Sequence, residues 1–496
     1  MKQLSGRGAA ALAVFLLGST AVHADITAEE VWQQLSDYYA DLGHDVTAGS
    51  KGMEGDTLIV RDAVFASDMP DASVTFSIAE LRMKELGDGR VEITMSEELP
   101  VTMKSSPATG EDVDMSMSIT QSDLKMIASG SVADTSYEFT APKLGIAFDG
   151  MMVDGKPVPM KFNASMEGNS GTTRITTGAT RAIDSQMASD KVDFSMAADD
   201  PEGQGNFVMS GSLTGLTGTT KSSFAEGIDM QDLSKALQAG TALEGTFAYT
   251  GGGYTFDFKD GEESVTGQST AEGGSLNFAM SKDGLTYGGE GKAATVSMQV
   301  SAFPMPIDMK IAESAFNLTM PVTKSDDEQP FGLLVKMVGL EVSDGIWGLF
   351  DPTSQLPRDP ATMIVDVSGG AKLLVDFLDP ENAKALEDTV PGEVTKLDIN
   401  ELKVSAVGAD LTGTGAMTFD NSAGTPKPIG SINLQLVGGN ALIDKLVAMG
   451  FVPEDQAMGA RMMLGMFAVP SGDDTLTSEI EFKEDGGIYA NGQRIQ

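Results

Sequence analysis

The sequence lacks the side chains from which most catalytic and metal sites are built. Its 496 residues include no cysteine and only 2 histidines, and His23 lies in an N-terminal segment that we expect to be removed. With His44 as the one remaining imidazole, we expect neither a zinc site nor a Ser-His-Asp triad. His44 follows a predicted helix, where a capping role is common. We therefore expect no metal, no cofactor and no disulfide, so that stability comes from burial.

Positive charge is also scarce. The chain has 33 Lys and Arg against 72 Asp and Glu, a formal net charge of −39. Loss of Lys2 and Arg7 with the N-terminal segment changes this charge to −41. Such a charge repels nucleic acids and anionic head groups, so we expect no nucleic-acid binding. An apolar contact or a basic partner remains open, as does an acidity that only keeps the protein in solution.

No apolar run reaches the length that spans a membrane. The run from Ala9 to Leu17 follows two basic residues and precedes small residues, including Val22 and Ala24. This is the pattern of a secretory signal, and the run is shorter than the roughly 18 residues of a membrane span. We interpret residues 1–24 as a cleaved signal peptide. The expected location is the periplasm, with no transmembrane anchor after cleavage.

The remaining sequence changes its hydrophobic period after one helix. Residues 26–42 are predicted to form a helix, because Thr27 and Glu30 have the spacing of a capping box and Gly43 follows. Beyond about residue 56, apolar and polar residues alternate, as at Val74 and Phe76. This alternation, interrupted by Gly, Asp, Asn and Pro, predicts antiparallel strands with one wet and one dry face.

We predict a mainly β fold with a few helices. Long, curved antiparallel meander sheets form two runs, with helices packed at the sheet ends or on the concave face. The first run covers residues 25–240 and includes the N-terminal helix, and the second covers residues 241–496. A short helix is expected near residues 230–239, and further helices near residues 329–348, 380–388 and 440–467.

Three motifs that can carry chemistry are better explained by turns and strand ends. Ser122 to Lys125 has the S-x-x-K spacing, but no K-T-G follows. Residues 288–292 are glycine-rich and end in lysine, yet they lack the phosphate-loop spacing, so we expect a hairpin turn. The acid clusters at residues 199–200, 326–328 and 473–474 do not match a calcium loop. We therefore expect a protein that is not an enzyme.

Methionine is abundant, with 30 residues, and many fall on the dry faces of predicted strands. Methionine is soft and fills irregular space, which favours core filling in a fold with few aromatics, and a pliable groove for acyl chains is the functional alternative. The methionines near the C-terminus are expected to pack against the sheet. The candidate groove residues are Met115, Met117, Met160, Phe162, Phe194, Met196, Phe278, Met280, Met298, Met309 and Leu318.

Two segments carry a family resemblance. Residues 331–369 contain a tryptophan followed by "LPRDP", and residues 481–493 form a glycine turn with an Asn-Gly. Together they resemble an uncharacterised exported family of alphaproteobacteria, domain-of-unknown-function 2125, which is similar in turn to AsmA-like envelope proteins. The resemblance implies long curved sheets and a link to lipid handling and outer-membrane upkeep, and it supplies no catalytic residues. The chain departs from AsmA-type proteins in its cleavable N-terminus.

Two functional hypotheses follow. The leading hypothesis is a non-enzymatic periplasmic protein that binds or chaperones an apolar envelope component, a lipid or a lipoprotein, in a curved-sheet groove. The alternative is an acidic structural or interaction protein of the cell envelope that holds no ligand. The expected partners are a lipid or other apolar ligand and an envelope protein. A hydrolase is a third class, which requires a polar cluster in a cleft.

Overall fold

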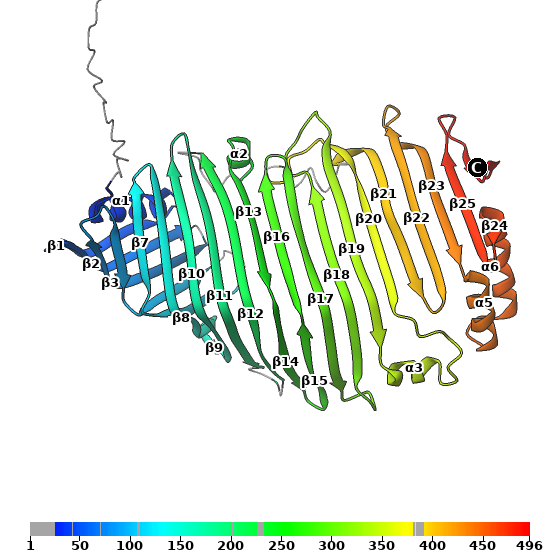
Figure 1. Cartoon of the computed structure of the whole chain (residues 1–496), viewed down its shortest axis with the longest axis horizontal. Coiled ribbons are helices and arrows are strands. Elements are labelled where there is room, and N and C mark those ends of the chain that lie inside the picture. Colours follow the sequence, from blue (N-terminus) through cyan, green and yellow to red (C-terminus); the bar gives the residue numbers. More distant parts are fainter. Residues whose placement is uncertain are drawn as a thin grey trace, which may run out of the picture.

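The computed structural model describes residues 25–496, except residues 42, 70, 107–109, 201–202, 204, 226–232, 380–381 and 383–390. The expected signal peptide, residues 1–24, lies outside the described residues. The described chain folds into one antiparallel sheet of 27 strands with five helices (Figure 1). The predicted fold class, a mainly β protein built on an antiparallel meander, is confirmed.

The N-terminal part contains one helix, α1 (Ala28–Asp41), and twelve strands. These strands are β1 (Asp45–Glu54), β2 (Thr57–Met69), β3 (Ala72–Glu85), β4 (Val91–Met95), β5 (Glu98–Ser105), β6 (Val113–Ser122), β7 (Lys125–Ser131), β8 (Asp134–Val153), β9 (Lys156–Val158), β10 (Met160–Thr177), β11 (Thr180–Asp199) and β12 (Asn206–Ala225).

The remaining helices are α2 (Leu233–Gln238), α3 (Asp344–Phe350), α5 (Gly439–Ala448) and α6 (Glu454–Phe467). The remaining strands are β13 (Ala242–Tyr249), β14 (Gly251–Asp260), β15 (Glu263–Ala271), β16 (Gly273–Ser281), β17 (Gly284–Val300), β18 (Ile307–Met320), β19 (Gln329–Val342), β20 (Ala361–Leu373), β21 (Gly392–Ala406), β22 (Ala409–Asp420), β23 (Lys427–Val437), β24 (Val469–Gly472), β25 (Thr475–Phe482), β26 (Ile488–Ala490) and β27 (Gln493–Arg494).

The same strand pattern occurs twice in the meander. Strand β3 pairs with both β4 and β5, which pair with β7 and β6, and β8 closes the pattern by pairing with both. Strand β12 pairs in the same way with β13 and β14, which pair with β16 and β15, and β17 closes the second pattern. The two predicted runs are continuous, because β12 pairs with β13 across residue 240.

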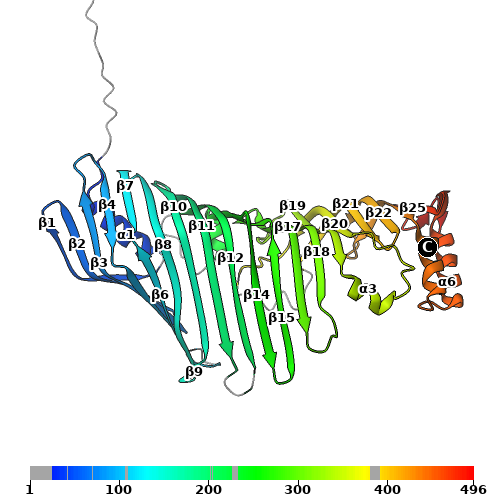
Figure 2. The ribbon, with the colours of Figure 1, turned by 60° about the horizontal axis from the view of Figure 1, so that its bottom comes forward.

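Helix α1 lies inside a curl of the N-terminal strands (Figure 2). Its Glu29 contacts Lys51 of β1 at 2.5 Å, whereas its Gln34 donates to the Thr135 hydroxyl of β8 at 3.1 Å. The path from β1 to β8 crosses about five inter-strand steps of about 4.8 Å, roughly 24 Å if flat. One helix about 10–12 Å wide reaches both strands only because the sheet bends around it.

The capping box predicted for α1 is confirmed. The Glu30 carboxylate accepts a hydrogen bond from the Thr27 amide at 2.9 Å, and the Glu30 amide donates to the Thr27 hydroxyl at 3.3 Å. At the other end, the Gly43 backbone has a φ of +83° and the His44 amide donates to the Tyr39 carbonyl at 2.9 Å. The His44 backbone amide therefore caps the helix, whereas its imidazole Nδ1 makes no hydrogen bond with the described residues.

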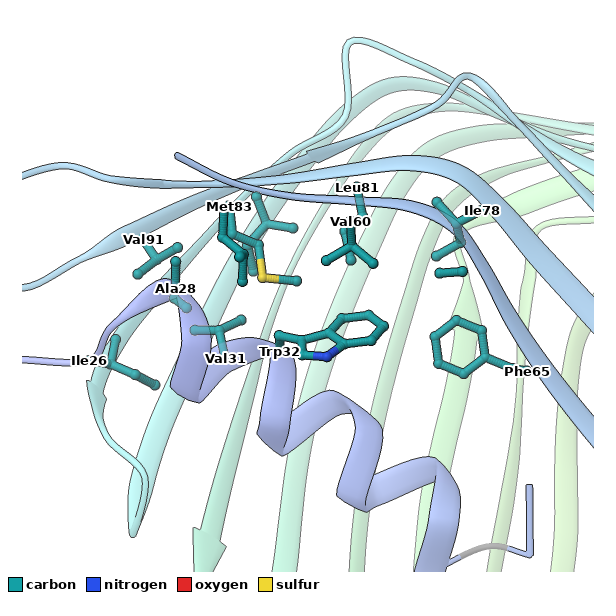
Figure 3. Packing of buried hydrophobic residues seen from close by; sticks show 14 residues of the cluster. Ile26, Ala28, Val31, Trp32, Val60, Phe65, Ile78, Leu81, Met83 and Val91 are labelled. Atoms are coloured by element: carbon teal, nitrogen blue, oxygen red, sulfur yellow. The ribbon is translucent and has the colours of Figure 1, made fainter. Parts of the chain in front are cut away.

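The main hydrophobic core lies between α1 and the curled strands (Figure 3). Val31 and Trp32 of α1 face Val60, Phe65 and other strand residues, and all of these are buried. Phe65 is fully buried, and its ring stacks on that of Phe76 at a centroid distance of 4.4 Å. The rest of the sheet has only scattered buried apolar side chains, because a second layer covers little of it.

One helix prediction is wrong. Residues 329–342 form strand β19, and the helix in this region is only α3. Phe331, Leu334 and Val338 fit a helical period, but Phe331, Leu333 and Val335 fit a strand period equally well. Hydrogen bonds from β18 and β20 on both sides decide in favour of the strand.

The other helix predictions have two outcomes. The predicted helices at residues 230–239 and 440–467 correspond to α2 and to the α5–α6 pair. The helix predicted at residues 380–388 lies outside the described residues, apart from Asn382.

Removal of the Phe65 ring will strongly destabilise the fold. We expect Phe65→Ala to lower the free energy of unfolding by about 3–5 kcal/mol, because a fully buried aromatic is lost and a cavity remains. Phe247 is 41% exposed, so Phe247→Ala is the matched control and will cost about 1 kcal/mol. Urea denaturation followed by tyrosine and tryptophan fluorescence measures both. Equal losses would contradict the assignment of the core to α1 and the curled strands.

Asp474 will make the C-terminal helices sensitive to acid. Its carboxylate accepts hydrogen bonds from the amides of Asn440 and Ala441, at 3.1 and 3.0 Å, and so caps α5. The Ala441 amide, above all, lowers the pKa of Asp474 and outweighs the opposing effect of burial. The ionised cap therefore stabilises the fold above the ordinary Asp pKa of about 3.9. This stabilisation is lost as the pH falls through the lowered pKa of the folded state.

We expect Asp474→Ala to cost about 1 kcal/mol at neutral pH, as for other helix caps. The difference in stability between the wild type and Asp474→Asn will shrink as the solution is acidified through that range. Denaturant midpoints of both proteins, measured side by side at each pH, test this. A constant difference at all pH values would show that the charge of Asp474 does not stabilise α5.

Candidate functional site

The register of the strands keeps one set of side chains on one face from end to end. Directly paired residues of neighbouring antiparallel strands project to the same side. Pairing from β1 to β25 joins the residues that we call the long row. The long row consists of Met53, Leu58, Met83, Ile93, Met126, Phe139, Gly171, Met187, Gly218, Phe247, Leu276, Gly289, Phe316, Val335, Val365, Leu402, Gly413, Leu434 and Ser478.

The long row contains no charged residue, although the chain as a whole is strongly acidic. Charged neighbours of the row, such as Glu290, Lys336 and Asp366, are one residue away along a strand and therefore project to the opposite face. On that face Lys336 pairs with Glu313 at 2.7 Å. The partner charge lowers the pKa of Glu313 and raises that of Lys336, chiefly through their hydrogen bond. The charges next to the long row thus lie on the opposite face, whereas on the face of the row Lys51 contacts Glu29 of α1 and Arg181 lies over the Tyr38 ring.

The long row is buried where α1 covers it and open over its middle, and its first residue, Met53, is 52% exposed. Under α1, Leu58 and Met83 are buried. Beyond the helix, Phe247, Leu276 and Phe316 are 41%, 46% and 39% exposed. These side chains are large and apolar, and no helix or strand of the described chain forms a second layer over them. The apolar face therefore continues into solvent where α1 ends.

A hydrogen bond between α1 and β8 closes the space beneath the helix, where the long row is buried. The Tyr137 hydroxyl of β8 donates to the Gln34 side chain of α1 at 2.5 Å. Burial raises the pKa of Tyr137 to about 12, so this hydroxyl stays neutral at physiological pH. The hydrogen bond between Tyr137 and Gln34 therefore adds no charge to the apolar face.

Glycines in the long row give its large side chains room to lie flat. A Cβ atom at Gly218 would come within 2.8 Å of Met187 Cγ, and one at Gly289 within 2.8 Å of Leu276 Cδ2 and 2.9 Å of Phe316 Cε1. The neighbouring apolar side chains therefore lie over the glycine backbone. Such pairs cover peptide groups that a glycine otherwise leaves exposed. The outcome is a low apolar surface without projecting side chains at these positions. We call the open part of the apolar face, around Phe247, Leu276 and Phe316, the trough.

Two apolar cavities lie along this face. The first, about 420 Å³, is lined by residues of β10 to β17, including Met187, Leu213 and Leu276. The second, about 450 Å³, lies between α1 and the sheet and is lined by Leu35, Ile183 and others. A third depression, about 930 Å³ and more polar, lies over β6, β8 and β10. The two apolar cavities mark where the open trough meets the helix-covered end.

All eleven candidate groove residues lie on the apolar face. A second row of paired residues contains Met117, Phe162, Met196 and Met298 together with Phe65 of the core. The pairings of the other seven assign them to the same side. However, the eleven are spread from β6 to β18, and only Met115 and Met160 line the third depression. None of them lines either of the two apolar cavities.

The residues that line the first cavity were not singled out from the sequence. Met187 and Leu213 come from the neighbouring strands β11 and β12, but Leu276 belongs to β16, and only the register across β12 and β13 brings it to them. The usable signal was the recurrence of glycine inside strand-like segments, at Gly215 and Gly218 and again at residues 288, 289 and 291. Glycine normally weakens a strand, and its repeated presence marks positions where another group approaches the backbone closely.

The prediction that the C-terminal methionines pack against the sheet is wrong. Met458, Met462, Met463 and Met466 of α6 are 65%, 64%, 62% and 58% exposed. The side of α6 that faces the protein carries the small Ala457, which is buried. The α5–α6 pair lies at the C-terminal end of the sheet (Figure 1). Its methionines project away from the protein.

The sequence motifs that are associated with catalysis or phosphate binding in other proteins lie in turns and strands here. Ser122 ends β6 and Lys125 begins β7, so the S-x-x-K motif is a tight turn. Residues 288–292 lie within β17 and not in a hairpin turn as predicted, because Gly289 belongs to the long row. In the "LPRDP" region, burial opposes ionisation of Asp351, but amide donors from Gln355 and Leu356 lower its pKa overall. This carboxylate holds the loop after α3.

Among the described residues, no cluster of three or more acidic or imidazole side chains is arranged to hold a metal ion. Within the same residues, no helix has both the length and the apolar character of a membrane span.

A probe attached to the long row will report an apolar environment. Thr246 and Phe247 are neighbours in β13, are both exposed and project to opposite faces. The chain has no cysteine, so Thr246→Cys and Phe247→Cys each accept a single polarity-sensitive fluorophore. We expect blue-shifted emission at position 247 and water-like emission at position 246. Identical spectra would contradict the separation of the two faces.

Comparison with known proteins gives a family but no curated relative. The family model described as "Uncharacterized protein conserved in bacteria (DUF2125)" matches residues 244–494, which span β13 to β27. No curated protein matches the chain. Because the family model covers half of the chain and most of the open trough, the chain belongs to the DUF2125 family of proteins conserved in bacteria.

Proposed function

We propose that this protein is a non-enzymatic periplasmic protein that binds the acyl chains of a lipid or lipoprotein along its apolar trough. The observation that supports this proposal is the long row, which is uncharged from β1 to β25 and large, apolar and exposed in its middle. Soluble proteins rarely leave a contiguous apolar patch above roughly 600 Å² without a binding partner.

The dimensions of the trough favour acyl chains. About 18 inter-strand steps of about 4.8 Å give the long row a contour length of roughly 85 Å. The acyl chains of one membrane leaflet span about half of the 30 Å hydrocarbon core, or about 15 Å. The open part of the row therefore accommodates several chains in sequence. A compact apolar metabolite would not require such a length.

The chemistry of the trough favours acyl chains without selecting a head group. Its two rows offer apolar and methionine side chains but no charge that would fix an anionic or cationic head. Methionine adapts to chains of different length and unsaturation because its side chain is flexible and polarisable. Because the trough is open to solvent, a polar head group remains hydrated while its chains are covered.

The position of α1 gives the trough one closed end. The cavity beneath α1 borders Ile183 of β11, and the first cavity begins nearby at Met187 of the same strand. An acyl chain bound along the open strands would end against α1. We expect the tightest binding here, since the chain terminus is covered on several sides.

Native mass spectrometry of the protein isolated from its own periplasm, followed by solvent extraction, tests the proposal. We expect bound lipid at defined stoichiometry. Leu276→Glu places a charge in the trough and will reduce the bound lipid several-fold, because an ionised carboxylate is costly to desolvate. Val208→Glu is the matched control, since Val208 is 43% exposed against 46% for Leu276 but projects to the charged face.

Two outcomes would contradict the proposal. A mass equal to the bare chain with nothing extractable would favour the alternative, an acidic interaction protein of the envelope without a ligand. Equal lipid loss in both variants would show that retention depends on total charge and not on the trough.

A further inference from the structure

Helix α6 has its apolar face turned to solvent. Its protein-facing side carries the small Ala457 and Ala460 and a half-buried Leu464, whereas the four methionines are about 60% exposed. Large apolar side chains in an amphipathic helix normally face the protein. The reversal means that the apolar face of α6 contributes little to the fold. We call Met458, Met462, Met463 and Met466 the methionine face.

The methionine face has the geometry of a helix-binding surface. Met458, Met462 and Met466 are spaced by four residues and form a stripe along the helix, with Met463 beside it. Gly459 lies between the stripe and Met463 and adds no side chain of its own, and the space beside it is open. Methionine-rich surfaces adapt to apolar anchors of different shapes.

The charges around the methionine face select a basic partner. Glu454 and Asp455 form the first turn of α6 and lie next to the face. On α5, Asp444 pairs with Arg461 of α6. No lysine is present in α6, and the chain as a whole has a net charge of −39. An approaching cationic segment is therefore attracted over long distances and meets carboxylates beside the apolar stripe.

We propose that the methionine face is a docking site for a basic amphipathic helix of a partner protein. The apolar side of that helix lies on the four methionines, and its lysines or arginines face Glu454 and Asp455. An anionic bilayer is a poorer occupant because the acidic chain is repelled from it. A second copy of this chain is also poorer, because it brings the same acidic groups to the contact. The proposal is independent of ligand binding in the trough.

A synthetic helix with leucines on one side and lysines on the other serves as the probe. Met462→Cys carries a polarity-sensitive fluorophore, because the chain has no other cysteine. We expect a saturable blue shift that weakens as salt is added. A control peptide of equal charge with serines in place of the leucines will give no blue shift.

Unlabelled variants compete in the same assay and assign the contact. Met458→Ser combined with Met463→Ser and Met466→Ser will bind at least about tenfold more weakly, because apolar burial is lost without a change in charge. Leu349→Ser in α3 is the matched control, since Leu349 is 54% exposed, and it will bind like the wild type. Leu276→Glu in the trough will also retain binding, so failure of the lipid proposal leaves this result unaffected.

Three results would overturn the docking proposal. If the triple serine variant binds the peptide as tightly as the wild type, the interaction is non-specific attraction between charges. If the fluorophore responds to zwitterionic vesicles and not to the peptide, the face is a membrane contact. If sedimentation shows a dimer that dissociates in the triple variant, the occupant is a second copy of this chain.

Discussion

The apolar face depends on one constraint, which is that the apolar residues of every strand project to the same side of the sheet. Side chains alternate with a period of two, so a shift by one residue within a single strand would move its apolar set to the charged face. Several strands contain a β-bulge, at which the alternation of side chains between the two faces shifts by one residue. The neighbouring strands shift at the same position along the register. Asp62, Gly168, Gly215, Ala293 and Gly339 occupy such positions with φ between +46° and +69°. The matched irregularities keep the apolar set on one side.

Two of these positions show how strictly the arrangement is maintained. Asp62 and Ala293 carry side chains in the left-handed region, at φ of +50° and +46°, where a residue with a Cβ atom loses roughly 1–2 kcal/mol. Glycine would adopt this conformation without that cost. The bulges also strengthen the local twist, which helps the N-terminal strands to curl around α1. The register thus connects the local backbone conformation with the shape of the apolar face.

A single-layer sheet with one open apolar face must also resist aggregation. The charged face supplies mutual repulsion between molecules, and the edges are blunted. Strand β24 at the C-terminal edge has four residues and includes Pro470, which cannot donate a backbone hydrogen bond. At the other edge, β1 contains Lys51 and two glycines. Short strands, proline and lysine are common means of protecting sheet edges. The acidity of the chain is therefore consistent with a sheet that leaves apolar surface uncovered.

The sequence predicted the fold where local signals agree with the tertiary structure. The Thr27–Glu30 capping box and the alternation in β3 are local patterns, and both were confirmed. The prediction failed at β19, because its nearly continuous apolar residues fit two periods and only the neighbouring strands choose between them. It also failed at α6, where composition favoured burial but Ala457 and Ala460 occupy the contact side. Composition cannot tell on which side of a helix the protein lies.

The sequence predicted which residues lie on the apolar face, but it did not predict where on that face the cavities are. Alternation assigned Met117, Phe162 and Leu318 to the dry face, because this depends only on neighbours within one strand. The first cavity depends on residues that successive pairings bring to the same level, as Gly218 of β12 does for Met187 and Phe247. Such pairing is fixed by the register of every intervening strand and is absent from any local pattern.

The two ends of the apolar face differ, and this difference gives the molecule a direction. Helix α1 covers the N-terminal end with buried contacts, whereas the long row ends at Ser478, whose hydroxyl donates to the Phe467 carbonyl of α6 at 2.5 Å. The trough thus ends beside the helix that turns its methionines outward. A ligand in the trough and a partner on α6 would occupy adjacent surfaces of different orientation. Because the open part of the long row and the methionine face both lie outside the core around α1, single exposed residues on either surface can be replaced without loss of that core.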